Sequence, residues 1–319
     1  MTRILFVTDF HGSLSCWLKS LTTIDKYNVD VALMSGDLTA KAIVPILDQG
    51  SGKFKFKFLG KWYKVKKEED LKKHLYKIKS YGFYPYICTE EESSRLAEDR
   101  SMLLKLFDKL AVDTMKEWLE LAEERVGNKV ENGDLKLIVM PGNDDSFVID
   151  EVIKKSKVAI YPLDKVLDID EHHQMISFDH VNPTPWDTPR EATEDELRKM
   201  LEKLFNKVDD YTNLIFQCHC PPYDSGLDSA PKLDEKMTPI YSFGQPVMIP
   251  VGSKAVREVV EKYQPKLGLF GHIHEAYGFT WIGRTLCLNP GSEYDRGIFK
   301  GYLIDLTRDK IEKFWRVEG

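Results

Sequence analysis

Five short hydrophobic runs recur along the chain, and each one stops at a polar residue that can bind a metal ion. Helical patterns lie between them, with apolar residues returning every three or four positions. Strands that alternate with helices predict βαβ units, and in such folds ligands collect beyond the carboxyl ends of the strands. The runs occupy residues 4–8, 31–34, 135–140, 214–217 and 267–270, and the helical patterns occupy about 14–27, 94–126, 194–208 and 253–263.

Residues 50–93 interrupt this rhythm. The segment KFKFKFLGKWYKV alternates lysine with apolar residues on either side of Leu59-Gly60, which predicts a β-hairpin, and a short helix follows. We therefore expect one domain over residues 1–319, interrupted at 50–93 by a small lysine-rich ββα lobe. The amphipathic pattern after the lobe predicts one long helix that ends near Gly127.

The lobe is strongly basic, because residues 53–79 hold eleven lysines against three acidic residues. The simplest interpretation is the solvated face of an edge hairpin, since lysines on an exposed strand prevent sheets from joining. The alternative is a phosphate-rich or nucleic-acid partner, which clustered lysines with interleaved aromatic rings would bind. A net charge of −6 for the whole chain weighs against nucleic acid, so this partner is not favoured.

Composition narrows the class of protein. The chain of 319 residues is 42% hydrophobic and 30% charged, as soluble globular proteins are. No apolar run reaches the roughly 18 residues of a membrane span, and no signal peptide is visible, so we expect a cytoplasmic protein without a membrane partner. The five cysteines are odd in number and scattered, which does not suit a disulfide framework and indicates a reducing compartment.

The polar residues at the strand ends form a set. In an extended segment residues i and i+2 point the same way, so Asp9 and His11 can approach one point, as can His272 and His274. Carboxylate, amide and imidazole groups without thiolates suit manganese, iron, zinc, cobalt or nickel better than calcium or magnesium alone. Seven such ligands suffice for two divalent ions if one carboxylate is shared. The motifs are Asp9-x-His11, Gly36-Asp37, Gly142-Asn143, His219 and Gly271-His272-x-His274.

In this order, the D-x-H, G-D, G-N-x-D, H and G-H-x-H motifs resemble those of the calcineurin-like metallophosphoesterases. The resemblance spans nearly the whole chain outside residues 50–93. The phrases GDLTAKAIVPI, NPTPWDTPRE and NPGSEY are similar to the branch of predicted phosphoesterases related to the Icc cyclic-nucleotide phosphodiesterase. The resemblance implies an α/β fold that is a four-layer α/β/β/α sandwich of two mixed sheets.

The resemblance also assigns the ligands. It implies that Asp37 bridges two divalent transition-metal ions, manganese being favoured, together with a water or hydroxide that acts as the nucleophile. One ion would take Asp9, His11, Asp37 and His274, and the other would take Asp37, Asn143, His219 and His272. Two such ions about 3.5–4 Å apart lower the pKa of a shared water and stabilise an in-line displacement. An amide suits the position of Asn143, because its oxygen can bind metal while its NH2 donates to phosphate.

Asp144 departs from the family pattern. Many members have histidine at this position, where it is thought to protonate the leaving oxygen or to assist the attack. An aspartate with an ordinary pKa of about 3.9 is ionised at neutral pH and is a poor general acid. Three interpretations stay open: Asp144 holds a histidine or a water beside the metals, or it is an acid whose pKa burial or pairing with Asp145 raises, or it is an inert turn residue. The candidate catalytic residues are Asn143 and Asp144.

The leading hypothesis is a dinuclear metal-dependent phosphoesterase that favours phosphodiesters. The alternatives are a phosphomonoesterase for nucleotides or phosphoproteins, and a scaffold that kept the fold and lost catalysis. Two further residues could approach the cleft, His180 just before the proline-rich loop at 181–191 and Arg190 within it, because loops at strand ends often line a site. The pair His172-His173 is more typical of a polar turn between strands.

Overall fold

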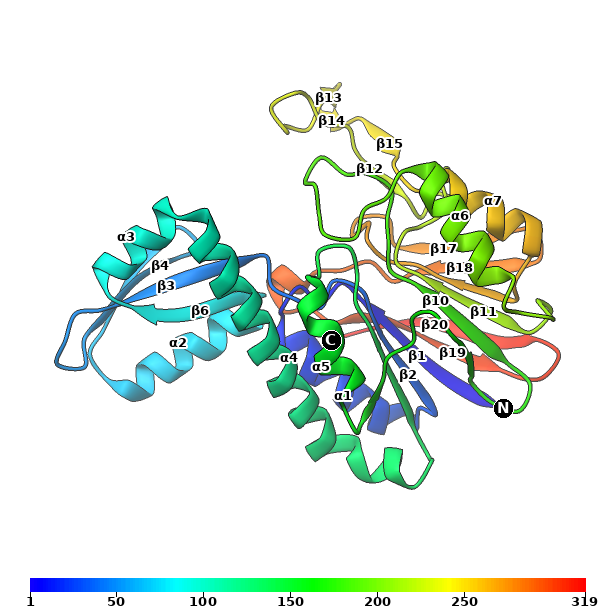
Figure 1. Ribbon diagram of the computed structural model, residues 1–319, viewed down its shortest axis with the longest axis horizontal. Helices are drawn as coiled ribbons and strands as arrows, with labels where there is room; N and C mark the ends of the chain where they lie inside the picture. Colours follow the sequence, from blue (N-terminus) through cyan, green and yellow to red (C-terminus); the bar gives the residue numbers. More distant parts are fainter.

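Two mixed β-sheets form the centre of the computed structural model, which describes residues 1–319 (Figure 1). The first sheet has the order β20 (Ile311–Glu318), β19 (Lys300–Leu306), β1 (Thr2–Thr8), β2 (Val31–Ser35), β7 (Lys136–Met140) and β8 (Ala159–Ile160). The second has the order β17 (Gly278–Ile282), β18 (Thr285–Asn289), β16 (Leu267–Leu269), β11 (Leu214–Cys218), β10 (Gln174–Phe178) and β9 (Val166–Asp168). Four neighbouring strands in each sheet are parallel, and antiparallel strands complete the sheets.

Helices cover the outer faces of both sheets. Those on the first sheet are α1 (Leu14–Tyr27), α4 (Arg100–Glu131) and α5 (Asp150–Lys154), and those on the second are α6 (Glu194–Phe205) and α7 (Lys254–Tyr263). The inner faces of the two sheets pack on each other through a separate cluster of buried aliphatic and aromatic side chains. The four-layer α/β/β/α sandwich expected from the sequence is therefore confirmed.

The hydrophobic runs of the sequence become strands that are buried on both faces. On β1, Ile4 and Phe6 face the second sheet, whereas Leu5 and Val7 face the helices, and all of them are buried. A strand covered on both faces needs no polar alternation, which is why its sequence is a continuous apolar run. The five predicted runs form β1, β2, β7, β11 and β16.

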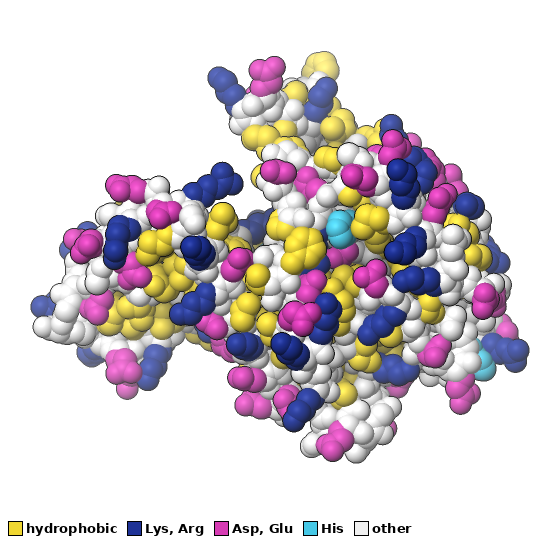
Figure 2. All heavy atoms as spheres, viewed as in Figure 1, with side chains coloured by type: hydrophobic (Ala, Val, Ile, Leu, Met, Phe, Trp, Pro, Cys, Tyr) yellow, Lys and Arg dark blue, Asp and Glu magenta, His cyan; other side chains and the backbone are white.

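The inserted lobe contains the predicted hairpin and helix and adds two strands to them. Its sheet has the order β5 (Lys61–Val65), β4 (Phe54–Phe58), β3 (Ala42–Asp48) and β6 (Phe83–Cys88), accompanied by α2 (Glu68–Ser80) and α3 (Glu90–Glu98). The added strands β3 and β6 pair in parallel, and each contains a proline, Pro45 or Pro85, which weakens a strand pattern in a sequence. The lobe has a small core of its own and projects to one side of the sandwich (Figures 1 and 2).

The helix expected at 94–126 is two helices in the structure. The first, α3, ends at Glu98, and α4 runs from Arg100 to Glu131, so the predicted end near Gly127 is wrong. Asp99 separates them because its carboxylate accepts a hydrogen bond from the backbone N–H of Met102 and caps α4. Gly127 stays helical although glycine costs about 1 kcal/mol in a helix, because the buried Val126 before it and the partly buried Val130 after it hold the helix to the core.

An arm at 229–250 rises from the second sheet. It is built from the pairs β12 (Ser229–Pro231) with β15 (Met248–Pro250) and β13 (Tyr241–Ser242) with β14 (Gln245–Pro246). Figure 2 shows a hollow between this arm and the lobe. No helix of the structure combines the length and the apolar character that a membrane crossing requires.

Candidate metal centre

The predicted ligands stand just after parallel strands, at the carboxyl edge of both sheets. Asp9 follows β1, Asp37 follows β2 and Asn143 follows β7 in the first sheet, and His219 follows β11 and His272 follows β16 in the second. The chain turns sharply at these points, because φ is 59° at Asp9, 41° at His11, 46° at Asp37 and 66° at His272. Positive φ is uncommon in residues other than glycine, and such strain clusters at functional sites.

Glycine precedes three of these residues because neighbouring loops lie against its backbone. A Cβ atom on Gly36 would lie 2.0 Å from His219 Nδ1, and one on Gly142 would lie 2.5 Å from Asp37 Oδ1. Gly271 is similarly confined, by side chains at the end of β1. The Gly-Asp, Gly-Asn and Gly-His pairs of the sequence therefore mark the places where the loops pack together.

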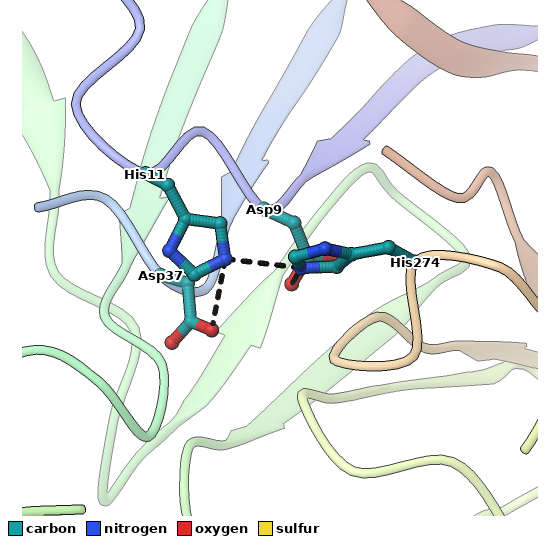
Figure 3. A group of neighbouring side chains, drawn as sticks. All are labelled: Asp9, His11, Asp37 and His274. Carbon is teal, nitrogen blue, oxygen red and sulfur yellow. Dashed lines mark hydrogen bonds and ion pairs between the residues drawn. The ribbon is translucent and has the colours of Figure 1, made fainter. Parts of the chain in front are cut away.

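The first group of side chains consists of Asp9, His11, Asp37 and His274 (Figure 3). His11 Nε2 lies 3.0 Å from His274 Nε2 and 3.4 Å from Asp37 Oδ2. His274 Nε2 also lies 3.4 Å from Asp9 Oδ1. One potential ligand atom from each of the four residues is within 4.8 Å of the others, so a single ion could contact all of them.

The second group shares Asp37 with the first. His219 Nε2 lies 3.3 Å from Asp37 Oδ1 and 3.0 Å from Asn143 Oδ1, and His272 completes the group. Asp37 faces the first group with Oδ2 and the second with Oδ1. The structure thus brings together all seven predicted ligands in the two sets that the family resemblance implies; that they bind metal stays a prediction.

The donor atoms fit divalent cations. The Nε2 atoms of His11 and His274 lie 3.0 Å apart, and each also faces a carboxylate oxygen. These nitrogen and oxygen atoms have more lone pairs than protons to share, and a cation between them would accept all of the lone pairs. The mixture of nitrogen and oxygen donors suits transition metals.

Burial and neighbouring charges shift the pKa values of His219 and His272 in opposite directions. Burial opposes protonation of His219, but the charges of Asp37 and Asp9 and a hydrogen bond to Asp37 raise its pKa to about 9. Burial and the nearby His219 lower the pKa of His272 to about 4. The two carboxylates therefore concentrate negative potential between the groups, where a positive charge is most favoured.

Asp144 lies at the rim of the first group. Its Oδ2 is 3.6 Å from His11 Nδ1 and 3.1 Å from Lys41 Nζ. Burial and repulsion from Asp37 raise the pKa of Asp144 to about 6, although the charge of Lys41 opposes the shift. The ring of Tyr294 packs on His11 with 4.4 Å between ring centroids. Asp144 therefore faces the nitrogen of His11 that points away from the other ligands.

Asp145 holds two loops together and does not pair with Asp144. Its carboxylate accepts hydrogen bonds from the backbone N–H groups of Leu38, Thr39 and Gly142 at 2.8–2.9 Å, and from the Thr39 hydroxyl at 2.7 Å. The side chain is completely buried. The turn that carries Asn143 and the turn that carries Asp37 are thus joined by one carboxylate.

The loop at 181–191 supports Asn143 from the other side. Asn143 Nδ2 donates to Thr188 Oγ1 at 2.9 Å, and the Thr188 hydroxyl donates to Glu191 Oε1 at 2.7 Å. The second N–H of the Asn143 amide donates to Asp144 Oδ1 at 3.1 Å. Both N–H groups of the Asn143 amide therefore donate hydrogen bonds within the protein. A hydrogen bond from this amide to a phosphate would require one of them to break. The amide oxygen, Oδ1, faces His219.

Arg190 and His180, which the sequence analysis considered for the cleft, form a charged cluster instead. The guanidinium of Arg190 is buried and pairs with Asp150 at 2.5 Å and Asp179 at 2.6 Å. His180 Nδ1 lies 2.7 Å from Asp179 Oδ1. Arg190 still supports the site, because its Nε donates to the backbone carbonyl of residue 145. The histidines at 172–173 lie in the turn between β9 and β10, as predicted.

Sequence reasoning missed Lys41, Thr188 and Tyr294 at this site. Thr188 belongs to a long proline-rich stretch, and the length of such a loop is itself a signal of function. Tyr294 ends the NPGSEY segment that contributes to the family resemblance. Lys41 lies in the phrase GDLTAKAIVPI, which contributes to the same resemblance, but its contact with Asp144 joins segments that are far apart along the chain and has no local signal.

The fold and these side chains define the protein as an α/β/β/α sandwich with a candidate two-metal centre. No protein-family model matches the chain. The chain is 29% identical over 158 residues to the uncharacterized protein MJ1162 of Methanocaldococcus jannaschii, in a match that covers 49% of this chain and spans 64% of that relative's length.

Two solved structures share the fold over nearly the whole chain. A crystal structure with 15% identity aligns with a TM-score of 0.57 over 98% of both chains. The protein TT1561 of Thermus thermophilus has 12% identity and a TM-score of 0.53, over 100% of this chain and 98% of that one. At such identities the likeness concerns the fold alone.

Proposed function

We propose that this protein is a dinuclear metal-dependent phosphoesterase of the calcineurin-like superfamily that prefers phosphodiesters. The observation that supports this most is the convergence of seven carboxylate, amide and imidazole side chains from both sheets, with Asp37 shared between two groups. Manganese is the ion that we favour. Membership of the Icc-related branch is a narrower proposal that rests on the three sequence phrases.

The protein's own groups would hold and orient the reacting parts. Two divalent cations at this site would polarise the phosphoryl oxygens and lower the pKa of an attacking water. Asp37 presents one oxygen to each group and would hold both cations. Thr188 fixes the Asn143 amide so that its oxygen faces His219. Lys41, whose side chain is 48% exposed beside Asp144, is placed to contact an anionic substrate.

The preference for diesters follows from Asp144. A carboxylate at the rim repels a phosphomonoester, which carries up to two negative charges at neutral pH, more strongly than a diester, which carries one. Asp144 is also engaged by Lys41 and faces His11, so it supports a histidine better than it protonates a leaving group. Esters with stable leaving groups, such as aryl phosphodiesters, should therefore be the better substrates.

Hydrolysis of an aryl diester and an aryl monoester tests this proposal. The protein is stripped with a chelator, reloaded with Mn²⁺, and assayed with bis(p-nitrophenyl) phosphate and p-nitrophenyl phosphate. We expect activity that depends on the cation and is higher for the diester. Asp37→Asn should abolish activity and lower the bound metal, whereas Asp195→Asn on the exposed face of α6 should change neither.

Three results would count against the proposal. Full activity without a divalent cation, or in Asp37→Asn, would contradict a metal-dependent reaction at this site. A faster reaction with the monoester would favour the phosphomonoesterase alternative. Two bound metal ions without hydrolysis of either ester would favour a scaffold that retains the centre.

A further inference from the structure

One face of the lobe carries a group of side chains that the proposed hydrolysis does not use. On β4, the aromatic residues 54, 56 and 58 alternate with Lys55 and Lys57, and Phe56 and Phe58 enter the small core under α2. On β5, Trp62 and Lys64 lie across from Lys57 and Lys55, respectively. Opposed residues of paired strands share a face, so these four side chains, the lysine–tryptophan face, point away from α2.

The lysines of this face lie near one another and have no acidic partners. Lys55 lies directly across from Lys64 in the strand register, and like charges in that position destabilise a sheet. No carboxylate lies within 4.0 Å of the ammonium groups of Lys55, Lys57 or Lys64. Lysines on the helix behind the sheet differ, because Lys72 and Lys73 have acidic partners one helical turn away.

Protection of a sheet edge explains only part of this pattern. Lysines on an edge strand prevent two sheets from joining, and β5 is an edge of the lobe's sheet. The neighbouring β4 is an interior strand, paired on both sides, and it nevertheless contributes Lys55 and Lys57 to the same face. Edge protection requires no charge on an interior strand, and a solvated face requires polar side chains but not positive charge alone, so the choice of lysine at these two positions is not explained by either.

The face also presents an aromatic ring to solvent. Trp62 is 58% exposed, and the ammonium of Lys55 lies 4.7 Å from the centre of the ring. An exposed tryptophan surrounded by lysines that have no acidic partners combines the two elements that single-stranded nucleic acids require. The ring stacks on a base, and the ammonium groups neutralise phosphates.

We propose that the lysine–tryptophan face binds single-stranded nucleic acid. This goes beyond the proposed function, because the face lies in the inserted lobe and shares no residue with the metal centre. Nucleic acid fits better than an anionic membrane, because a lipid surface is entered by apolar side chains grouped on one side, whereas the exposed ring of Trp62 shares its face with three lysines. Bases stacked on Trp62 would place successive phosphates near Lys55, Lys57 and Lys64.

Binding of a fluorescein-labelled single-stranded oligothymidylate, measured by anisotropy at several salt concentrations, tests the proposal. The full-length protein is used in excess chelator, so that hydrolysis cannot interfere. We expect the triple variant Lys55→Ala, Lys57→Ala, Lys64→Ala to bind more weakly and to lower the slope of log affinity against log salt by about 2. Trp62→Ala should weaken binding about tenfold while leaving that slope unchanged.

The matched control removes three exposed lysines from the helix on the opposite side of the lobe, in the variant Lys72→Ala, Lys73→Ala, Lys77→Ala. It changes the net charge equally and should bind like the unaltered protein. Thermal unfolding of each variant verifies that the lobe remains folded.

Three outcomes would overturn the proposal. The first is equal weakening by the two triple variants, which would show a general charge effect. The second is no loss in Trp62→Ala, and the third is binding to vesicles of phosphatidylserine and phosphatidylcholine with no binding of the oligonucleotide. Failure here is distinguishable from failure of the proposed function, because hydrolysis of small aryl esters depends on the metal centre and not on this face.

Discussion

Single residues at the strand ends decide whether the two groups of ligands can form. Asp9, His11, Asp37 and His272 all adopt positive φ, which residues other than glycine rarely do. The glycines beside them are needed for a different reason, since a side chain on Gly36 would occupy the space of the His219 ring. Strain and close approach therefore occur together at the site, which is typical of positions constrained by function.

The substitution Gly36→Ala should reveal how closely the turns pack. Its Cβ would lie 2.0 Å from His219 Nδ1, so the ring must move, and we expect the free energy of unfolding to fall by about 3 kcal/mol with loss of Mn²⁺ affinity. Gly52→Ala is the control, because Gly52 has a similar φ of 71° but no atom within 4 Å of a new Cβ. Gly52→Ala should lower the free energy of unfolding, measured with urea, by only about 1 kcal/mol. Equal losses in both variants would show that backbone conformation, not contact with His219, is responsible.

The position of Asp144 gives a second prediction at the scale of one residue. In Asp144→His, an imidazole would stand beside His11 and could donate a proton to a leaving oxygen. We expect turnover of an alkyl phosphodiester to rise about tenfold or more relative to an aryl phosphodiester, with an unchanged metal content. Activity assays with paired substrates, together with metal analysis, provide the measurement. An unchanged ratio of the two rates would contradict the interpretation that a general acid is missing at this position.

At the scale of elements, a buried arginine joins segments that carry the site. Arg190, from the loop before α6, pairs with Asp150 on α5 and with Asp179 at the end of β10. Burial alone would raise the pKa of Asp179, but its bonds to His180 and Arg190 outweigh this and lower it. A group whose folded pKa is depressed stabilises the protein above its unfolded pKa of about 4 and loses that contribution as pH falls through the folded value.

The substitution Arg190→Met should therefore be strongly destabilising at neutral pH. Removing the guanidinium leaves the buried carboxylates of Asp150 and Asp179 without the cation that they share, at a cost of about 3–5 kcal/mol. The difference from the unaltered protein should shrink as the pH falls below about 5, because a protonated carboxyl no longer needs the cation. Urea unfolding between neutral and acidic pH measures this. In the control Arg198→Met, which breaks pairs on the protein surface only, we expect little change in stability at any pH. A loss in Arg190→Met that is independent of pH would contradict this role.

At the scale of the whole molecule, the site lies where the two sheets meet. Asp9, Asp37 and Asn143 come from the first sheet, and His219 and His272 come from the second. Cations bound between them would link the two halves of the sandwich as well as neutralise buried carboxylates. Binding should therefore stabilise the entire fold and not only the loops.

Addition of Mn²⁺ to chelator-treated protein should raise its thermal unfolding temperature. At a free metal concentration of 100 times the Kd, the gain in stability is about 2.7 kcal/mol, which corresponds to a shift of a few degrees. Scanning calorimetry with increasing Mn²⁺ measures it. In Asp37→Asn the shift should be lost or much reduced, because that residue belongs to both groups. An equal rise in the variant would place the stabilising ions elsewhere on the protein.

Local sequence patterns were sufficient for a large part of this structure. The apolar runs and the helical periodicities depend on neighbouring residues, so the five strands and the alternation of strands with helices could be predicted. Glycine before Asp37, Asn143 and His272 was visible for the same reason. The two-sheet sandwich and the division of the seven ligands into two sets were implied by the family resemblance of the ordered motifs. Four other strands had weaker local patterns and were not predicted, namely β3 and β6, which contain prolines, and β19 and β20.

The contacts that tune the site were decided only by the tertiary structure. Lys41 meets Asp144, Thr188 holds the Asn143 amide, Asp145 ties two turns together, and Arg190 is buried beneath them. Each contact joins segments that are distant along the chain, and its geometry depends on how the sheets and loops pack. A sequence pattern shows which residue types are present at a turn, but the direction of each side chain is set by the atoms that the fold places around it.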